Sequence, residues 1–304
     1  MPTTRVPRAP SVDFDVWGCR GSRGLTPGRS AYGTRTSCYS LLGGEDVVVF
    51  DAGSGLAMLG AALTREARFS RVKRVWVLLS HAHMDHWEGL KDVDWFWKRD
   101  RPLAVTLLGT AEALQTVARA FEPPSYVPLR TLVSGGPVSV VEVPLRAGDE
   151  REVGPFGVRV VALHHYSGEG ATKRVLDAVG FQVSRDGGPV VAYVSDHEPP
   201  RDGGGAEESL LAGADLALGD AHFARRDDER HGHGSQEFWA SAARAHPKTL
   251  VVAGHLGPLL ADSGIREAAS RHGRRLPNFV LAREGDTWRW NGRERRFGRR
   301  GSRG

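Results

Sequence analysis

The sequence predicts a sheet-rich α/β fold, and three observations lead to this fold class. Apolar runs of strand length outnumber the segments with helical spacing along the 304 residues. The predicted strands are grouped around a few helices and do not alternate strictly with them. Polar side chains able to bind a metal follow several of these strands directly, as is typical of the loop-bearing edge of an α/β sheet.

The first predicted elements are strands. The segment SVDFDVWG (11–18) alternates apolar and acidic residues with the two-residue period of a half-buried strand. Residues 36–53 contain two apolar runs joined at Gly43-Gly44, which indicates a hairpin. The chain therefore begins with three neighbouring strands.

The remaining elements mix strands and helices. Strands are predicted at 74–80, 104–109, 138–143, 157–165, 214–223 and 249–255. Helices are predicted at 56–68, at 110–121 with Thr110 as its cap, around 235–245 and near 262–272. Hairpins are predicted at 181–196, turning at Asp186-Gly187-Gly188, and at 278–290, where a hairpin would close the fold.

Bulk composition fits a cytoplasmic globular protein. No apolar run reaches the roughly 18 residues of a membrane-spanning helix, and the N-terminus lacks the apolar segment of a secretory signal. Two cysteines, Cys19 and Cys38, do not make a disulfide framework. We therefore expect a cytoplasmic location and no membrane partner.

The net charge of +5 is concentrated at the two ends of the chain. Residues 1–12 hold two arginines and no acid, and residues 293–304 hold six arginines and one glutamate, so the body between them is slightly acidic. We expect one domain at 12–292, a disordered basic tail at 1–11 and a disordered Arg/Gly-rich tail at 293–304. Such tails can hold a phosphate backbone through charge alone, which leaves nucleic acid open as a partner.

The most informative stretch is SHAHMDHWEGL (80–90), which follows a predicted buried strand. Along an extended segment, residues i and i+2 point the same way, so His81 and His83 can face one cation. Asp85 and His86 come after the chain bends and can face a second cation close by. Imidazole and carboxylate ligands suit zinc, or manganese or iron where carboxylates are abundant. The alternative is a solvated polar loop.

Other metal-capable residues follow other strands. His164 and His165 follow VRVVAL, Asp196 follows VVAYVS, and His255 follows TLVVAG. Because these strands are apolar, the residues after them are expected at the rim of a core. On an alternating strand, His164 and His165 face opposite ways, so only one of them can point at a metal.

HAHMDH, together with the downstream His165, Asp196 and His255, resembles the metallo-β-lactamase superfamily of dinuclear metal hydrolases. Four further motifs are similar to its ribonuclease Z-like and cyclic-phosphodiesterase branch: GCRGS (18–22), YGTRTSCYSL (32–41), VVVFDAGSGLAMLG (47–60) and VAYVSDHEP (191–199). The resemblance covers roughly residues 12–265. It implies an αββα four-layer sandwich, with two sheets face to face, helices outside and the metals at one edge.

The resemblance also implies two divalent metal ions, zinc first, with manganese or iron as alternatives. It assigns seven ligands: His81, His83 and His165 for the first metal, Asp85, His86 and His255 for the second, and Asp196 as the bridge. His165 is selected over His164 because the family's ligand usually comes two residues after an apolar core residue, here Leu163. A hydroxide bridging the metals would be the nucleophile. Asp51 would orient a ligand histidine, or is a strand-end turn residue.

The branch often carries a histidine of a Gly-His-Ser-Thr type motif near the scissile phosphate. Here the text is HGHGSQ, so the histidine is displaced by one residue from the serine. His233 is the candidate to stabilise the phosphoryl oxygen or to protonate the leaving oxygen, and His231 and His222 compete with it. Asp220 is expected to support the site or to be a satisfied buried carboxylate.

Two further features have both a functional and a structural interpretation. Arg35 stands where the family commonly has asparagine, and could clamp a phosphate or carboxylate or lie on the surface. Trp95, Phe96 and Trp97 follow the metal loop and could stack on a substrate or pack in the core. We favour core packing for at least one of the tryptophans.

These observations predict a phosphodiesterase acting on a small phosphodiester such as a cyclic nucleotide, with Asp85 and His233 as catalytic residues. Only 31 positions separate His165 from Asp196, which leaves no room for the long tRNA arm of ribonuclease Z enzymes. The alternatives are a ribonuclease Z-like endoribonuclease, a lactone or thioester hydrolase, and a nucleic-acid-binding protein with a degenerate site. Homodimer formation stays open.

Overall fold

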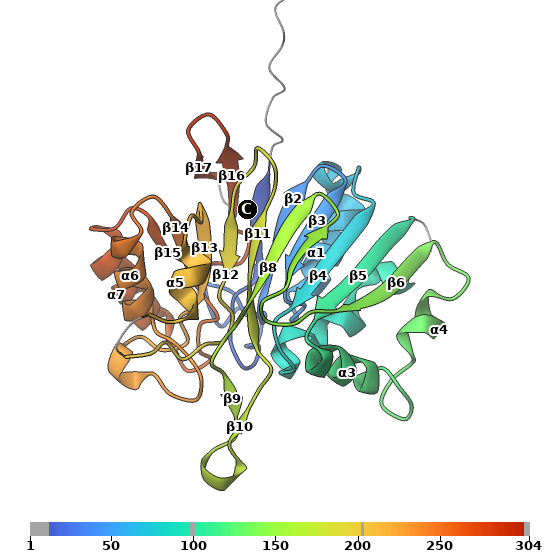
Figure 1. The fold of residues 1–304 in the computed structure, drawn as a ribbon, viewed down its shortest axis with the longest axis horizontal. Coiled ribbons are helices and arrows are strands. Elements are labelled where there is room, and N and C mark those ends of the chain that lie inside the picture. The colour runs from blue at the N-terminus through green and yellow to red at the C-terminus, as the bar shows by residue number, and fades with distance from the viewer. Residues whose placement is uncertain (1–11, 98–100, 202–203, 301–304) are drawn as a thin grey trace, which may run out of the picture.

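Two mixed β-sheets face each other in the computed structural model, which describes residues 12–97, 101–201 and 204–300 (Figure 1). The first sheet has eight strands in the order β17-β16-β1-β2-β3-β4-β5-β6. Their bounds are β1 Asp13–Gly18, β2 Cys38–Gly43, β3 Asp46–Phe50, β4 Arg74–Leu79, β5 Leu103–Gly109, β6 Val138–Pro144, β16 Thr287–Asn291 and β17 Arg296–Arg300.

The second sheet has seven strands in the order β15-β14-β13-β12-β11-β8-β7. Their bounds are β7 Glu150–Val153, β8 Phe156–Ala162, β11 Val179–Ser184, β12 Val191–Tyr193, β13 Leu216–Asp220, β14 Leu250–Gly254 and β15 Phe279–Leu281. A separate two-stranded arm, formed by β9 (Tyr166–Ser167) and β10 (Arg174–Val175), projects from the lower end of the molecule in Figure 1.

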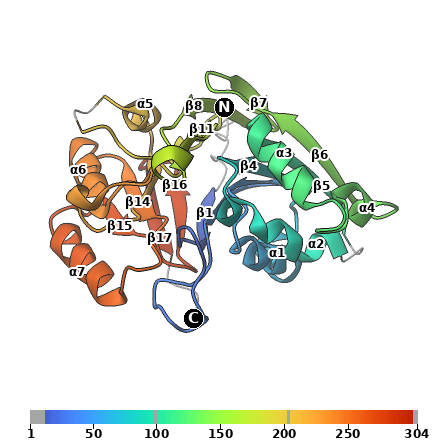
Figure 2. The same cartoon turned by 90° about the horizontal axis from the view of Figure 1, so that it is seen from below.

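Helices cover the outer faces of both sheets, which confirms the αββα four-layer sandwich (Figure 2). The helices beside the first sheet are α1 Leu56–Arg65, α2 Asp94–Trp97, α3 Ala111–Ala120 and α4 Leu129–Val133. Those beside the second sheet are α5 Ala206–Leu211, α6 Gln236–Ala245 and α7 Asp262–Gly273. Within the described ranges, no helix has the length and apolar character needed to cross a bilayer.

Strands β1, β2 and β3 of the first sheet are buried on both faces, and β3 shows why residues 47–50 are continuously apolar. Val48 and Phe50 belong to the core that also contains residues of β8 and β11, between the two sheets. Val47 and Val49 point the other way, into the core that contains Leu59 of α1. Because successive side chains point to opposite faces, a strand between two cores favours apolar residues on both of its faces.

Most predicted elements are confirmed, and their local signals act as expected. The Thr110 side chain accepts a hydrogen bond from the backbone N–H of Ala113 at 3.3 Å and so caps α3. Ser235 caps α6 in the same way, accepting from Phe238 at 3.1 Å. Strands β2 and β3 pair antiparallel across the predicted Gly43-Gly44 turn. These side-chain caps satisfy N–H groups that the first helical turn leaves without a partner.

The predicted closing hairpin at 278–290 is wrong, because its two strands lie in different sheets. Strand β15 pairs with β14 in the second sheet, whereas β16 pairs with β1 in the first. The chain therefore crosses from one sheet to the other between these strands. A pattern of two short apolar runs around a glycine specifies strands but not the partner of each strand.

The prediction of a disordered tail at 293–304 is also wrong, because residues 296–300 are ordered. Residues 296–300 form β17, which pairs antiparallel with β16 and extends the domain beyond residue 292. Phe297 is buried there and packs against Trp290, with ring centroids 5.2 Å apart. The single aromatic residue among arginines was the signal for a strand. The tail predicted at 1–11 and residues 301–304 lie outside the described residues.

Candidate metal centre

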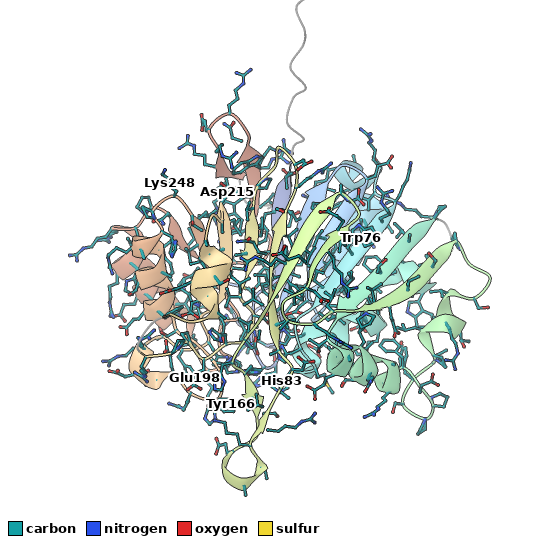
Figure 3. The ribbon with its side chains drawn as sticks, viewed as in Figure 1. Trp76, His83, Tyr166, Glu198, Asp215 and Lys248 are labelled. Carbon is teal, nitrogen blue, oxygen red and sulfur yellow. The ribbon has the colours of Figure 1, made fainter. Side chains whose placement is uncertain are left out.

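The predicted ligands converge because several strands end at one edge of the sandwich. Strands β8, β12, β13 and β14 run in the same direction, so their carboxyl ends meet at this edge. Strand β4 of the facing sheet delivers the HAHMDH loop to the same place. Figure 3 shows His83 at this lower edge, whereas Asp215 and Lys248 mark the opposite one. Carboxyl ends of strands are where α/β sheets gather their ligands.

The structure brings together all seven residues predicted as metal ligands. Donor atoms of one group lie within 4.8 Å of one another: His81, His83, His165 and Asp196. A second group satisfies the same limit: Asp85, His86 and His255. Each group offers nitrogen and carboxylate donors of the kind that zinc binds.

Asp196 lies between the two groups, with one carboxylate oxygen toward each. Its Oδ2 is 3.7 Å from His81 Nε2 and 3.6 Å from His165 Nε2. Its Oδ1 is 3.2 Å from His86 Nε2 and 3.1 Å from His255 Nδ1. A carboxylate with this placement can bridge two cations.

Unsatisfied polar atoms show that these residues fit a metal. Among the described residues, several donor atoms of the site are buried without a hydrogen-bond partner: His81 Nε2, His86 Nε2, His255 Nε2 and Asp196 Oδ1. A buried polar atom without a partner costs free energy, and native proteins rarely leave several of them in one place. Divalent cations coordinated between the two groups of ligands would supply partners for the Nε2 atoms of His81 and His86 and for Asp196 Oδ1.

The charge states of the histidines agree with metal binding. Burial, with a contribution from His86, lowers the pKa of His81 well below its usual value and lowers that of His83 to about 4. Neutral imidazoles offer the lone pairs that a cation needs. His86 differs, because Asp196 and Asp85 raise its pKa well above the usual value against the effect of burial. The carboxylates around His86 thus favour a positive charge at this position.

Asp51 lies directly behind His86, as the orienting role requires. Its Oδ2 accepts a hydrogen bond from His86 Nδ1 at 2.6 Å, which leaves Nε2 free to face the ligand cluster. The same carboxylate accepts bonds from the backbone N–H and the hydroxyl of Ser80, both at 2.8 Å, and from the hydroxyl of Tyr193. The residue has a positive φ of 56°, a conformation uncommon outside glycine and often found at functional sites.

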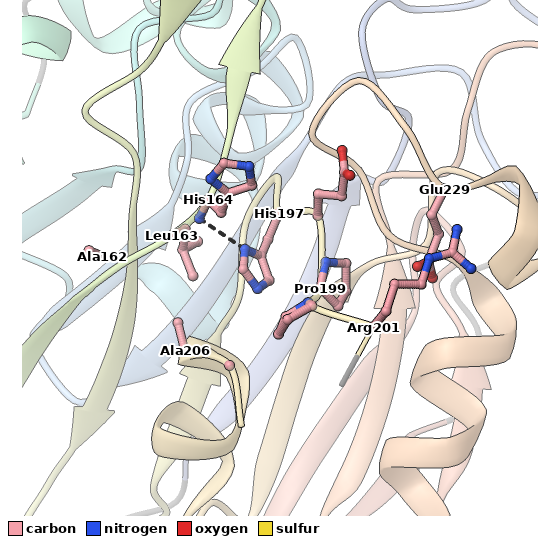
Figure 4. Close-up of a pocket in the computed structure, with 11 residues that line it drawn as sticks. Ala162, Leu163, His164, His197, Pro199, Arg201, Ala206 and Glu229 are labelled. Atoms are coloured by element: carbon pink, nitrogen blue, oxygen red, sulfur yellow. Dashed lines mark hydrogen bonds between the residues drawn. The ribbon is translucent and has the colours of Figure 1, made fainter. Parts of the chain in front are cut away.

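His165 and not His164 joins the ligand cluster. His165 is fully buried, and its Nδ1 donates to the carbonyl of Gly232 at 2.8 Å, so that Nε2 points at the cluster. His164 is exposed and lines a separate cavity of about 540 Å³ (Figure 4). There its backbone N–H donates to Nδ1 of His197 at 3.0 Å. The two rings therefore point in different directions just after the end of β8.

Glu198 supports His165 through a neighbouring loop, and no local sequence pattern indicates this role. One oxygen of Glu198 accepts hydrogen bonds from the Tyr166 hydroxyl at 2.7 Å and from the backbone N–H of Gly232 at 3.0 Å. It thereby holds the residue whose carbonyl orients His165. Gly232 has a φ of 77°, and a Cβ there would lie 2.4 Å from the Nδ1 atom of His165, so glycine is required.

We expect Glu198→Ala to weaken binding of the first metal about 10- to 100-fold, the usual effect of losing a partner that orients a ligand. Zinc affinity measured by competition with a chromophoric chelator checks this. The matched control is Glu198→Gln, which keeps an oxygen to accept the two bonds and should lose much less. Wild-type affinity in the alanine variant would contradict the orienting role.

His233 lies beside the cluster and is held by Asp220. Its Nδ1 donates to Asp220 Oδ2 at 2.9 Å, and its ring stacks on His255 with centroids 5.1 Å apart. Burial raises the pKa of Asp220 to about 7, although His222 and backbone N–H groups favour the charged form. His222 stacks on His233 with centroids 4.2 Å apart and belongs with Asp220, His233 and His255 to a third group of close donor atoms. That group was not predicted.

The other candidates lie elsewhere. His231 is partly exposed and faces Glu169 at 3.1 Å. The guanidinium of Arg35 forms an ion pair with Glu284 at 2.9 Å. This contact does not support the interpretation of Arg35 as a residue that binds a phosphate. Trp95 and Phe96 are buried in the core beside α1, which confirms the packing interpretation for one tryptophan, and Trp97 is exposed.

Comparisons with known proteins agree with this architecture. A family model described as a beta-lactamase superfamily domain matches residues 47–256. No curated protein sequence matches the chain.

Solved structures share the fold at low sequence identity. The metallo-β-lactamase fold protein YhfI from Bacillus subtilis has a TM-score of 0.64 at 15% identity, covering 92% of this chain and 99% of its own. Zinc-bound PqqB from Methylobacterium extorquens has a TM-score of 0.62 at 17% identity, covering 90% and 99%. A diphosphatase from the PhnP family has a TM-score of 0.60 at 18% identity, covering 91% and 96%.

Proposed function

This chain belongs to the metallo-β-lactamase-fold superfamily, and on that premise we propose that it is a metal-dependent hydrolase of small phosphodiesters. The observation that carries the proposal is the position of Asp196, with one oxygen toward each of two groups of ligands. A pair of cations held this way suits the displacement of an oxygen from phosphorus.

The residues form two sets of metal ligands, and a different group orients a histidine of each set. His81, His83 and His165 would hold the first metal, Asp85, His86 and His255 the second, and Asp196 both. When bound, the two cations supply Lewis acidity and lower the pKa of a water so that it can attack at neutral pH. Asp51 and the Gly232 carbonyl keep His86 and His165 turned toward the cations through their Nδ1 atoms.

We assign protonation of the leaving group to His233, which lies beside the ligand cluster. Asp220 holds the Nδ1 proton of His233 and, when charged, stabilises a second proton on Nε2. That proton can pass to the departing ester oxygen, which raises the rate of the bond-breaking step. The His233–Asp220 pair lies next to the ligand cluster and is not needed as a ligand of either proposed metal.

A small substrate fits the short arm better than a large one. The arm of β9 and β10 spans only residues 166–175, between His165 and Asp196. The fold is shared with a diphosphatase, which shows that it can host chemistry at a phosphorus centre. The short arm favours a small phosphodiester over tRNA.

Elemental analysis combined with a substrate panel tests the proposal. The purified protein should contain about two divalent ions per chain and hydrolyse bis(p-nitrophenyl) phosphate in preference to a lactone, a thioester and a β-lactam. Asp85→Ala should abolish the diesterase activity, whereas Glu142→Gln, an exposed change on edge strand β6, should leave it unchanged. Metal-loaded protein without activity on any ester would refute the proposal and favour a binding function.

A further inference from the structure

A groove of about 680 Å³ opens beside the metal centre, between the loop after β1 and the loop after β14. Its lining includes Arg23, Leu25, Arg29, Leu259 and Asp262. Figure 2 shows the first of these loops, in blue, running next to the orange-red chain that leads into α7. The hydrogen bond from the backbone N–H of Ala31 to Asp262, at 2.7 Å, joins the two walls.

Both walls of the groove begin at residues in contact with the predicted metal ligands. The backbone N–H of Ser22 donates to Asp85 Oδ2 at 2.8 Å, and Arg23 is the next residue. Gly21 lies against His255 so closely that a Cβ there would be 2.4 Å from its ring. On the other wall, Leu259 follows His255 by four positions. A substrate held at the metals therefore has this groove next to it.

The groove offers positive charge. Arg23 and Arg29 are exposed, and across the described ranges neither forms an ion pair with a carboxylate. The carboxylate in the groove is already engaged: Asp262 accepts from the Ser30 hydroxyl at 2.5 Å and from the Ala31 N–H, and lies 3.6 Å from the buried guanidinium of Arg20. The guanidinium groups of Arg23 and Arg29, which have no carboxylate partner among the described residues, therefore set the local charge.

The groove also contains exposed apolar side chains. Leu259 is 91% exposed, and Leu25 lines the same groove from the opposite loop. An isolated exposed leucine needs no explanation, but one placed beside two unpaired arginines forms a mixed surface. Such a surface matches a ligand with a planar or apolar body and a second anionic group.

We propose that this groove binds the far arm of the substrate and selects phosphodiesters whose arm carries an additional phosphate on an apolar or planar body, such as a 5′-phosphorylated dinucleotide. Guanidinium groups bind phosphate through two parallel hydrogen bonds, and the leucines cover the body of the arm. The inference deepens the proposed function and rests on it. A simple cyclic nucleotide, with a single phosphate at the metals, would leave the arginines without a ligand.

The test compares two substrates that differ only in the second phosphate. The dinucleotide pApA has a diester and a terminal 5′-phosphate, and ApA has the diester alone. We expect a lower KM for pApA in the metal-loaded wild type, and a rise of about tenfold or more in that KM in the double variant Arg23→Ala/Arg29→Ala, as for the loss of charge-assisted hydrogen bonds. The kcat for both substrates and the KM for ApA should stay unchanged.

A matched control separates this effect from net charge. The variant Arg65→Ala/Arg119→Ala removes the same two charges from the exposed surfaces of α1 and α3 and should leave both KM values as in the wild type. An unchanged ratio of the KM for pApA to that for ApA in the groove variant would overturn the inference. Equal effects of both double variants would overturn it as well.

Failure of the groove and failure of the proposed function give different results. If the wild type cleaves neither dinucleotide nor bis(p-nitrophenyl) phosphate, the proposed function fails. The proposal for the groove is then tested by calorimetric binding of pApA and ApA to the same metal-loaded proteins. Tighter binding of pApA that is lost only in the groove variant would still support the groove. Equal binding of the two dinucleotides by the wild type would refute it.

Discussion

Asp196→Ala is expected to remove bound metal and abolish hydrolysis. The two oxygens of this carboxylate face different groups of ligands, each within 3.1–3.7 Å of two imidazole nitrogens. Its removal takes one donor from each predicted cation and leaves six residues, five of them buried, without their shared negative charge. The loss should exceed the roughly 10²- to 10³-fold drop typical for a single electrostatic contact in an active site.

Elemental analysis and diesterase assays on the same preparation check this expectation. The variant should contain well under one ion per chain, and its thermal midpoint should lie near that of wild type stripped of metal by a chelator. Glu142→Gln again serves as the control for purification losses. An Asp196→Ala protein that retains two ions and wild-type turnover would show that the carboxylate is not a shared ligand.

The ligands could be predicted because each is tied to a local signal. Each predicted ligand outside the HAHMDH loop follows an apolar strand. Because parallel strands place their carboxyl ends at one edge of a sheet, the positions of these residues in the sequence were enough to predict that they lie close together. The choice between His164 and His165 needed only the alternation of a strand and the resemblance to a known family. The structure places His165 inward and His164 in a separate cavity.

The supporting residues could not be predicted, because their roles depend on tertiary contacts. Tyr193 reaches Asp51 from the opposite sheet, 142 positions away in the chain, and nothing in its own strand indicates this. Glu198 acts through Gly232, 34 positions downstream. Strand β17 was missed because its arginines suggested a solvated tail, whereas pairing with β16 and burial of Phe297 decide its structure.

Asp51→Ala is the second change with a large expected effect, because it acts on stability and on metal binding together. The mutation leaves the buried donors of Ser80, His86 and Tyr193 without their acceptor. Breaking a buried charged network of this kind typically costs about 3–5 kcal/mol in the free energy of unfolding. Because His86 also loses the bond that orients it, zinc affinity should fall by about 10- to 100-fold.

A second buried carboxylate on the same strand separates the two effects of the Asp51 change. Asp46 begins β3, binds Arg74 through both oxygens at 2.6 and 2.8 Å, and lies at the opposite end of the strand from Asp51. Asp46→Ala should therefore lower the free energy of unfolding in urea without changing zinc affinity. If Asp51→Ala lowered stability alone, as Asp46→Ala should, Asp51 would be a structural carboxylate and the orientation of His86 would have to come from its packing.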